Sequence, residues 1–566
     1  MTDQTVPPLK LDTSGEPIAP PIAAIFLVNF DHRKGYTLTW HRSVDGVQVE
    51  GVVECKSLPS GLHNVGEDLV YFIHDEYAGL SAFVNRPDEQ SDRAVRMLAI
   101  GVLVPLEHGR MGRSWRHAET LKELARAQLE SLGNTTALEE YWEKYRLKPE
   151  EQPSQVSQDP ADDDTSERRN GYTKARAMSS ATTFISSHHS LTPHHPALTL
   201  IDSIKLFGPL LFPLYRAALL RKRILIVTDA PVEFACNLVY NLSILSSISY
   251  STLPLIPKAN SSDAKLRPLF TVGVMDIGQL EQERGTGASQ GFVACTTDDV
   301  LASKPDLYDV LVLMPKSEAD HAATKVFPRI VLSSPELTKA FPKIGIRATQ
   351  RDCRRFSHLL QGLRHLERDE VAASDEETSS VLSDSSSYTL DKELVEPSSW
   401  SRVAYTSLVW WASAGDRRAG FAENEENESE TDRALLLGED GESQIREVAV
   451  VALFHRITAA IFQTIADATA RTDDSGQSDE RYHDDSDDNE VANTVADSRP
   501  EETQALVAVK DEQEVAISHE DMVEMGLDSW SVSDRKFVEE MVHLWWGRRS
   551  VVRSEVIECC GLRLGF

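Results

Sequence analysis

One stretch constrains the fold more than any other, residues 291–315, with the sequence GFVACTTDDVLASKPDLYDVLVLMP. Two apolar runs flank a polar segment, in which Thr296 and Thr297 offer hydroxyl groups as helix N-caps. Asp298 and Asp299 then place carboxylates on the first helical turn, where the helix dipole favours negative charge. Two apolar strands joined by a crossover helix predict a parallel sheet that is covered on both faces. Because the stretch lacks a nucleophile beside a base, a phosphate loop and a metal cluster, we interpret it as the framework of a binding surface.

The residues around this stretch continue the alternation of strands and helices. The expected elements are a helical stretch at 201–219, a strand at 224–228, a helix at 232–245, a strand at 268–274 and a helix at 348–363. Pro231 fits the first position of its helix, and Thr349 fits the N-cap of the last helix. Residues 196–365 are therefore expected to form a three-layer α/β module.

The beginning of the chain has a different pattern, in which closely spaced strands precede helices. Strands are expected at residues 22–29, 35–41, 69–74, 79–85 and 95–106. From Ser114 onwards the apolar residues recur with helical periodicity. Residues 21–147 are therefore expected to form an α+β module with a five-stranded antiparallel sheet.

Polar and acidic segments separate these modules, and we expect them to be disordered because they cannot bury enough apolar surface. They are residues 1–20, a linker at 148–195, an acidic, serine-rich loop at 366–398, and two insertions at about 413–444 and 471–532. The two insertions interrupt a downstream helical region that spans residues 399–566. This region has an aromatic segment at 400–411, and helices are expected at 448–468 and 534–546.

Charge and cysteine usage exclude several classes of protein. The chain has 58 basic and 89 acidic residues and a net charge of −31, which argues against binding of nucleic acid and against direct attraction to anionic membranes. Its 6 cysteines form no C-x-x-C pair, so we expect a reducing compartment and no disulfide framework. No signal peptide and no apolar run of about 18 residues is visible, so we expect a cytoplasmic protein without a transmembrane segment.

No motif predicts covalent catalysis, a cofactor or a metal ion. The basic stretch at 109–113, GRMGR, could hold an anion at a helix N-terminus, but we favour a solvated turn. The histidine pairs at 188–189 and 194–195 are interpreted as parts of a solvated loop, and His455 as a core or edge residue of its helix. A hydrolase is the weakest alternative, because no serine lies on a strained turn near the histidines of the first module, which are His41, His63, His74, His108 and His117.

Several unbroken segments point to a known family. The first module carries FLVNFDHRKGYTLTWHRS and LAIGVLVPLEHGRMGRSWRHAETLKELA. The second carries FGPLLFPLYRAALLRKRILIVTDAPVEFACNLVYNLSIL, PLFTVGVMDI and the stretch at 291–315, and RATQRDCRRFSHLL and SWSRVAYTSLVWWASAG follow. In this order the segments resemble the DENN-domain proteins of the LCHN-like branch, which is common in fungi. The resemblance is continuous over about residues 20–365.

The resemblance implies a longin-like upstream module, a central α/β module and a small helical downstream part. It also implies guanine-nucleotide exchange on a Rab-type small GTPase in membrane traffic, without a cofactor or covalent chemistry, and peripheral membrane association through that partner. An exchange factor binds the switch regions of the GTPase and speeds GDP release, because such switch loops are easily biased.

No catalytic residue can be carried over from the family. The residues that we expect to contact a partner are Thr296, Thr297, Asp298 and Asp299, with Arg216 and Arg223 as further candidates. Asp298 and Asp299 are also explained as helix-capping residues. The alternative function is a scaffold or adaptor that does not exchange nucleotide, with its acidic, serine-rich loops as docking segments tuned by phosphorylation.

Overall fold

A computed structural model of the chain describes most of the expected modules. The described residues are 19–148 except 32, 59, 88–94 and 132, and then 191–257, 265–282, 291–316, 326–333, 345–373, 394–397, 445–480, 514–553, 556–559 and 562–565. Most of the segments expected to be disordered, and the aromatic segment at 400–411, lie outside the described residues.

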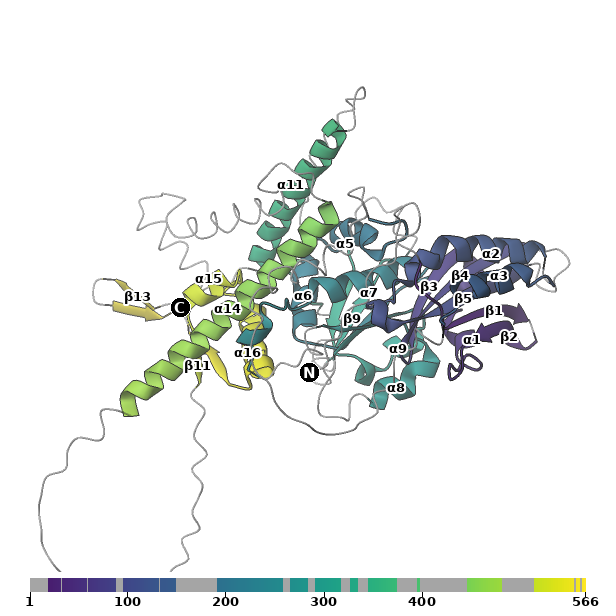
Figure 1. The fold of residues 1–566 in the computed structure, drawn as a ribbon. Helices are drawn as coiled ribbons and strands as arrows, with labels where there is room; N and C mark the ends of the chain where they lie inside the picture. Colours follow the sequence, from purple (N-terminus) through teal and green to yellow (C-terminus); the bar gives the residue numbers. More distant parts are fainter. Residues whose placement is uncertain are drawn as a thin grey trace, which may run out of the picture.

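The described part of the chain is organised around one ten-stranded sheet with the order β10-β9-β6-β8-β7-β3-β4-β5-β1-β2 (Figure 1). The upstream half of the sheet consists of β1 (Ala24–Asp31), β2 (Gly35–Ser43), β3 (Glu67–His74), β4 (Tyr77–Pro87) and β5 (Val95–Pro105). The central half consists of β6 (Ile224–Val227), β7 (Arg267–Thr271), β8 (Phe292–Thr296), β9 (Val310–Leu313) and β10 (Arg329–Leu332). The sequence predicts the two halves as separate modules, whereas the structure joins them in one sheet.

The upstream half is the expected antiparallel sheet with helices behind it. Its strands pair β3-β4, β4-β5, β5-β1 and β1-β2, all antiparallel. The helices of this half are α1 (Val53–Lys56), α2 (Ala118–Glu130) and α3 (Thr136–Tyr145). α2 covers β4 and β5 (Figure 1), because its apolar face buries Leu121, Ala125 and Leu129.

The central half confirms the parallel sheet expected from residues 291–315. β6 pairs in parallel with both β8 and β9, so it lies between the two strands of that stretch. β7 pairs in parallel with β8, and β10 is antiparallel to β9. The crossover from β8 to β9 contains α9 (Asp299–Ala302) and a 3-10 turn at Pro305–Leu307. α9 ends at Ala302, with Ser303 as its C-cap residue.

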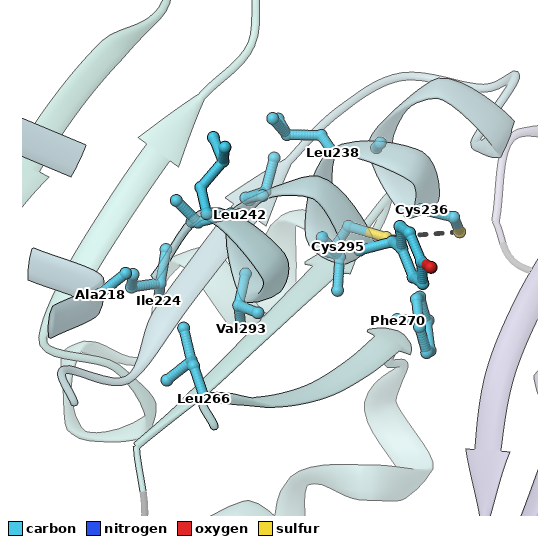
Figure 2. Close-up of a cluster of buried hydrophobic side chains, with 14 of the residues drawn as sticks. Ala218, Ile224, Cys236, Leu238, Leu242, Leu266, Phe270, Val293 and Cys295 are labelled. Atoms are coloured by element: carbon cyan, nitrogen blue, oxygen red, sulfur yellow. Dashed lines mark hydrogen bonds between the residues drawn. The ribbon is translucent and has the colours of Figure 1, made fainter. Parts of the chain in front are cut away.

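Both faces of the central half are buried, as an alternating pattern of side chains shows. Ile224 and Ile226 of β6 belong to the main core, whereas Leu225 belongs to a second cluster on the opposite face. The main core lies under α5 (Leu200–Phe207), α6 (Leu211–Leu219) and α7 (Glu233–Leu245). Figure 2 shows part of it, with Leu238 and Leu242 of α7 and Val293 of β8. The second cluster lies under α8 (Ile277–Gln282) and α9. These are the three layers predicted from the sequence.

Gly291 provides a test of how closely the chain is packed at the start of β8. An added Cβ at Gly291 would lie 2.0 Å from the carbonyl oxygen of Arg221, and a backbone carbonyl cannot move aside as a flexible side chain can. We expect Gly291→Ala to lower the free energy of unfolding by about 1–3 kcal/mol. Gly278→Ala is the control, because an added Cβ there meets nothing within 4 Å. Equal melting temperatures of the two variants would contradict this packing.

The two halves of the sheet meet at a narrow seam. β3 and β7 pair antiparallel at Phe72 and Phe270. Beside this contact, the Asp68 carboxylate of β3 accepts hydrogen bonds from the N–H groups of Val232 at 2.7 Å and Glu233 at 3.2 Å. A side chain of the upstream half therefore caps α7 of the central half. The expectation for Pro231 was wrong, since Val232 is the N-cap residue and Pro231 precedes it.

The capping carboxylate predicts a measurable pH dependence. Burial raises the pKa of Asp68 from 3.8 to about 6, although its three backbone hydrogen bonds oppose the shift. The proton on Asp68 therefore stabilises the fold at low pH, and this contribution is lost as the pH rises from about 4 through about 6. Asp68→Asn lacks this titrating group. As the pH rises across this window, the unfolding free energy of the variant should therefore increase relative to that of wild type by up to about 3 kcal/mol. Urea denaturation at several pH values measures the difference, and a difference that is constant with pH would contradict the assignment.

The downstream region packs back on the central half, as expected. Its helices are α11 (Gln350–Ala373), α14 (Arg446–Glu480), α15 (His519–Glu524) and α16 (Val532–Trp546). Its short strands are β11 (Val515–Ile517), parallel to β12 (Ser550–Val552), and a hairpin of β13 (Val556–Cys559) and β14 (Leu562–Gly565). The Tyr215 hydroxyl of α6 lies 2.6 Å from the Thr458 hydroxyl of α14. Side chains from all three parts of the chain thus form one core.

Several expectations for the loops and helix ends were wrong. β11 and α15 lie inside 471–532, which was expected to be disordered throughout, and α14 extends twelve residues beyond 468 to Glu480. The range 366–398 also contains ordered residues. α11 extends into it as far as Ala373, and Val395 forms a β-bridge with Ala348. His195 is buried against Trp115 and Tyr240 and is no solvated loop residue. Short polar segments of this kind are ordered by distant partners, which local composition does not reveal.

Two described segments are long and apolar enough to cross a membrane, Pro196–Leu219 and Arg446–Asp474. In the structure 72% and 56% of their most apolar windows are buried. Gly208 and Pro209 break the first segment into α5 and α6. Core helices meet the same criteria as membrane spans, and both segments contribute side chains to the core described above.

Candidate partner-binding surface

Four of the predicted contact residues, Thr296 to Asp299, lie at the carboxyl end of β8, on the same edge of the sheet as the carboxyl ends of the parallel strands β6, β7 and β9. Open α/β sheets bind their ligands at this edge. Thr296 is buried, and its hydroxyl accepts a hydrogen bond from the Asp298 N–H at 3.1 Å. The Thr297 hydroxyl is also buried and has no hydrogen-bond partner among the described residues. The hydroxyl groups of both threonines are therefore directed into the turn and not towards solvent.

The two aspartates are placed differently from each other. Asp298 occupies the N-cap position of α9, but its carboxylate makes no capping hydrogen bond to the described backbone. Instead, its Oδ2 atom lies against Gly273, only 3.4 Å from where a Cβ on that glycine would be. Asp299 is exposed on the first turn. Hydrogen-bonded capping of α9 thus does not explain why either carboxylate is present, although the helix dipole favours both charges.

The hairpin of β1 and β2 reaches the same turn from the upstream half. Burial raises the pKa of the Tyr36 hydroxyl, and the nearby charge of Asp298 raises it further. The Tyr36 ring, 38% exposed, also lies 5.4 Å from the ring of Phe30. Residues from both halves of the sheet therefore contribute to one surface across the seam.

Exposed apolar side chains follow Gly273 and Asp299 in the chain. Val274 and Met275 follow Gly273 and are 50% and 72% exposed, and Val300 of α9 is 52% exposed. Exposed apolar groups that gather beside charged ones are typical of interaction sites. We call the surface formed by Tyr36, Val274, Met275, Asp298, Asp299 and Val300 the seam surface.

A buried ion pair fixes the seam surface between the two halves. Lys56 of α1 lies 2.8 Å from Asp276, with side chains 16% and 9% exposed, and it donates a second hydrogen bond to the Ile73 carbonyl at 2.8 Å. Asp276 also accepts a hydrogen bond from the Gly273 N–H at 2.9 Å. The segment that carries Val274 and Met275 is thereby held to the upstream half, so a partner would meet a preorganised surface.

Arg216 does not lie on this surface. It is buried on α6, and its guanidinium donates hydrogen bonds to both carboxylate oxygens of Asp352, at 2.7 and 2.8 Å. Asp534 of α16 lies 3.2 Å from the same guanidinium. Burial alone would lower the pKa of Arg216, but the two carboxylates raise it above its ordinary value. Arg216 therefore joins α6 to α11 and α16, and its charge is not offered to a partner in this conformation.

Arg223 is likewise used within the fold. It is buried and bonded to the Asp309 carboxylate at 2.7 Å and to the Asp306 carbonyl at 2.8 Å. Burial would raise the pKa of Asp309, but the hydrogen bonds from Arg223 lower it overall. The structure thus brings together the four residues at 296–299 and separates both arginines from them. Tyr36, Val274, Met275 and Val300 were missed, because their meeting depends on the joined sheet.

The described residues hold no metal-binding cluster, and His117 of the upstream half is buried in the core. Within them, no three His, Cys, Asp or Glu side chains are grouped in a way that could hold a metal ion. Among the histidines of the upstream half, His117 is buried between the Tyr141 hydroxyl at 2.6 Å and the Pro20 carbonyl at 2.9 Å. Burial lowers its pKa to about 4, so it remains neutral at physiological pH and serves the core. The seam surface is thus suited to binding.

Comparison with family models finds two matches along the chain. A model described as DENN domain-containing protein 11 matches residues 25–324, which include the whole seam surface. A second model, described as a domain of unknown function (DUF4484), matches residues 395–565, which include α14, α15 and α16.

Similar proteins come from animals and yeasts. DENN domain-containing protein 11 of Xenopus laevis is 34% identical over 301 residues, which cover 51% of this chain and 59% of that protein, and that of Danio rerio is 33% identical over 294 residues, covering 51% and 53%. The chain thus spans little more than half the length of these relatives. The uncharacterized protein ANR2 of Saccharomyces cerevisiae is 24% identical over 583 residues, covering 97% of this chain and 96% of that protein. Because the DENN domain-containing protein 11 model matches more than half of the chain, this chain belongs to the DENN domain protein family.

Proposed function

We propose that this protein is a guanine-nucleotide exchange factor for a Rab-type small GTPase and that the GTPase docks on the seam surface. DENN domain proteins generally act in this way, which supports the activity. The observation that carries the proposal is that exposed apolar and acidic side chains from both halves of the sheet meet at one preorganised edge.

The chemistry of the seam surface suits a switch region. Methionine and tyrosine side chains are enriched at protein interfaces. Tyrosine in addition buries much apolar area at low cost in rotamer entropy. Asp298 and Asp299 would sit at the rim, where charges select and orient a partner more than they add affinity. A specific interface buries about 800 Å² on each partner, so neighbouring parts of β2, α8 and α9 would also take part.

The exchange step follows from linkage and needs no covalent chemistry. A factor that binds the nucleotide-free GTPase more tightly than the GDP-bound form lowers the affinity of GDP by the same ratio. The switch loops of the GTPase have two conformations, and binding of the exchange factor shifts the equilibrium between them. The carboxylates at the rim would contribute by holding basic or amide groups of the GTPase in the nucleotide-free arrangement.

Equilibrium binding distinguishes this function from its alternative. The affinity of the full chain would be measured against a panel of Rab GTPases, each prepared nucleotide-free and GDP-bound. An exchange factor prefers the nucleotide-free form of at least one GTPase, and we expect a preference of about a hundredfold or more, equivalent to about 2.7 kcal/mol. The absence of such a preference across the panel would overturn the proposal.

The alternative function is a scaffold that uses the same fold without exchange. This alternative is supported by the net charge of −31 and by the acidic, serine-rich loops, which phosphorylation would make more negative. A scaffold would bind the GDP-bound and nucleotide-free forms equally. Within the family, we also propose that the chain belongs to the LCHN-like branch, on the segments quoted above, and that it is a cytoplasmic protein that reaches membranes through its GTPase.

A further inference from the structure

The two ends of the ten-stranded sheet differ in how the structure covers them. At one end β10 is only four residues long, and the Ile346 N–H donates a hydrogen bond to its Ile330 carbonyl at 2.7 Å. At the other end β2 has nine residues and pairs with β1 alone among the described strands (Figure 1). No other backbone–backbone hydrogen bond of the described residues reaches residues 35–43. An uncovered edge of this kind offers unpaired N–H and C=O groups to another strand.

The residues of β2 leave this edge able to pair. Edge strands that avoid pairing commonly contain proline or lysine, and the β2 sequence GYTLTWHRS contains neither. Its aromatic and β-branched residues favour an extended strand. Its arginine, Arg42, is held in place by Glu139 at 3.1 Å and by the Trp40 ring, whose centroid lies 5.4 Å away. The one charged side chain of the strand is therefore positioned before any partner arrives.

A bulge marks the middle of β2. Leu27 of β1 lies opposite Trp40 and Val28 lies opposite Leu38, so Thr39 has no partner on β1. Such an extra residue bends the strand that carries it. Thr39 is exposed and is the middle residue of the strand Gly35–Ser43. A two-fold axis at Thr39 would therefore pair two β2 strands over their full length and place both bends at the same point.

The residues that face each other in this antiparallel register are complementary. The facing pairs are Tyr36 with Arg42, Leu38 with Trp40, and Arg33 of the preceding turn with Asp45 of the following loop. They combine a ring with a cation, two apolar groups, and two opposite charges, each of which is a favourable cross-strand pair. No two like charges face each other from residue 33 to residue 45. The edge is thus complementary to a second copy of itself.

We propose that two copies of this chain associate through β2 about a two-fold axis at Thr39, so that one sheet runs through both. Such an interface uses the same patch on each copy and closes after two copies. Nine residues form a contact about 30 Å long. One pair of strands buries less than the roughly 800 Å² that each partner buries in a stable complex. We therefore expect a reversible dimer with a Kd on the order of 10 μM.

Sedimentation equilibrium of the full chain tests the dimer over concentrations from well below to well above this Kd. We expect the mass to rise from that of one chain towards twice that mass. Thr39→Glu places two carboxylates face to face at the axis and should weaken association at least about tenfold. Thr39→Ser is the control, because it keeps the hydroxyl that donates to the Leu27 carbonyl and accepts from the Asn29 amide. A wild type that has the mass of one chain at every concentration, or an unchanged Kd for Thr39→Glu with a wild-type melting temperature, would overturn the proposal.

A charge swap tests the register. Arg33→Glu would face Asp45 of the other copy at two equivalent places, and we expect association to weaken about fivefold or more. Adding Asp45→Arg restores opposite charges and should return the Kd to that of wild type, which a change in fold stability alone would not do. If the double variant associates as weakly as Arg33→Glu, this register is wrong and the proposal fails. The measurement contains no GTPase, so its result is independent of the proposed exchange activity, although Tyr36 belongs to both surfaces.

Discussion

Arg216→Ala is expected to destabilise the fold more than any other single substitution considered above. The substitution removes the cation that holds the Asp352 and Asp534 carboxylates, whose side chains are 3% and 1% exposed. Burial already raises the pKa of Asp534 even with Arg216 in place. Because removing one partner of a buried ion pair leaves unpaired charge in the interior, we expect the free energy of unfolding to fall by about 3–5 kcal/mol. Urea denaturation monitored by tryptophan fluorescence measures this loss.

The same two helices offer a matched control. Lys222, just after α6, pairs with Glu540 of α16 at 2.6 Å, but both side chains are about one-third exposed, at 34% and 33%. Exposed ion pairs contribute about 0–1 kcal/mol, so Lys222→Ala should change stability little. If Arg216→Ala does not fold, the triple variant Arg216→Met, Asp352→Asn, Asp534→Asn should recover most of the stability, because it leaves no buried charge. Similar losses for Arg216→Ala and Lys222→Ala would contradict the structural role of Arg216.

Met275→Arg is expected to have the largest effect on nucleotide exchange. Met275 is the most exposed apolar side chain of the seam surface, at 72%, and the fold gains little from burying it. A long cation at this position would remove an apolar contact and place charge at the centre of the proposed interface. Central interface residues cost about 2 kcal/mol or more when they are disrupted, so we expect the exchange rate at subsaturating factor to fall by about 30-fold or more. The melting temperature should stay unchanged.

The matched control introduces the same arginine on the downstream region. Leu544 of α16 is 46% exposed, and Figure 1 shows α16 apart from α8 and α9. Leu544→Arg should therefore retain wild-type exchange. Equal losses in the two variants would mean that added positive charge, and not the seam surface, is responsible.

The local architecture could be predicted from sequence because its signals are short-range. The two apolar runs of 291–315 and the polar segment between them lie within one stretch of sequence. The N-cap of its helix was predicted wrongly, because Asp298 occupies that position and not Thr296 or Thr297. Thr349 caps α11 as predicted, since its hydroxyl accepts from the Asp352 N–H at 3.1 Å. By contrast, the insertion of β6 between β8 and β9 and the joining of β3 to β7 depend on pairings between distant segments. No local pattern encodes these pairings.

The candidate surface was only partly predictable for the same reason. Thr296 to Asp299 could be singled out because polar residues interrupt an apolar stretch. Arg216 and Arg223 look like surface cations in sequence, but their counter-ions lie far along the chain, with Asp352 136 residues and Asp309 86 residues away. The charge of Asp298 raises the pKa of Tyr36, although the two residues are far apart in the sequence. Burial and long-range charge pairing thus decide which polar residues remain available to a partner.

Nucleotide exchange through the seam surface is tested most directly by the rate at which a fluorescent GDP analogue leaves each GTPase of a Rab panel in the presence of the full chain. We predict that wild type accelerates release from at least one GTPase, that Met275→Arg loses this acceleration, and that Leu544→Arg keeps it. Unchanged release rates across the whole panel with folded wild-type protein would contradict exchange activity. Acceleration that Met275→Arg leaves intact would contradict docking at the seam surface.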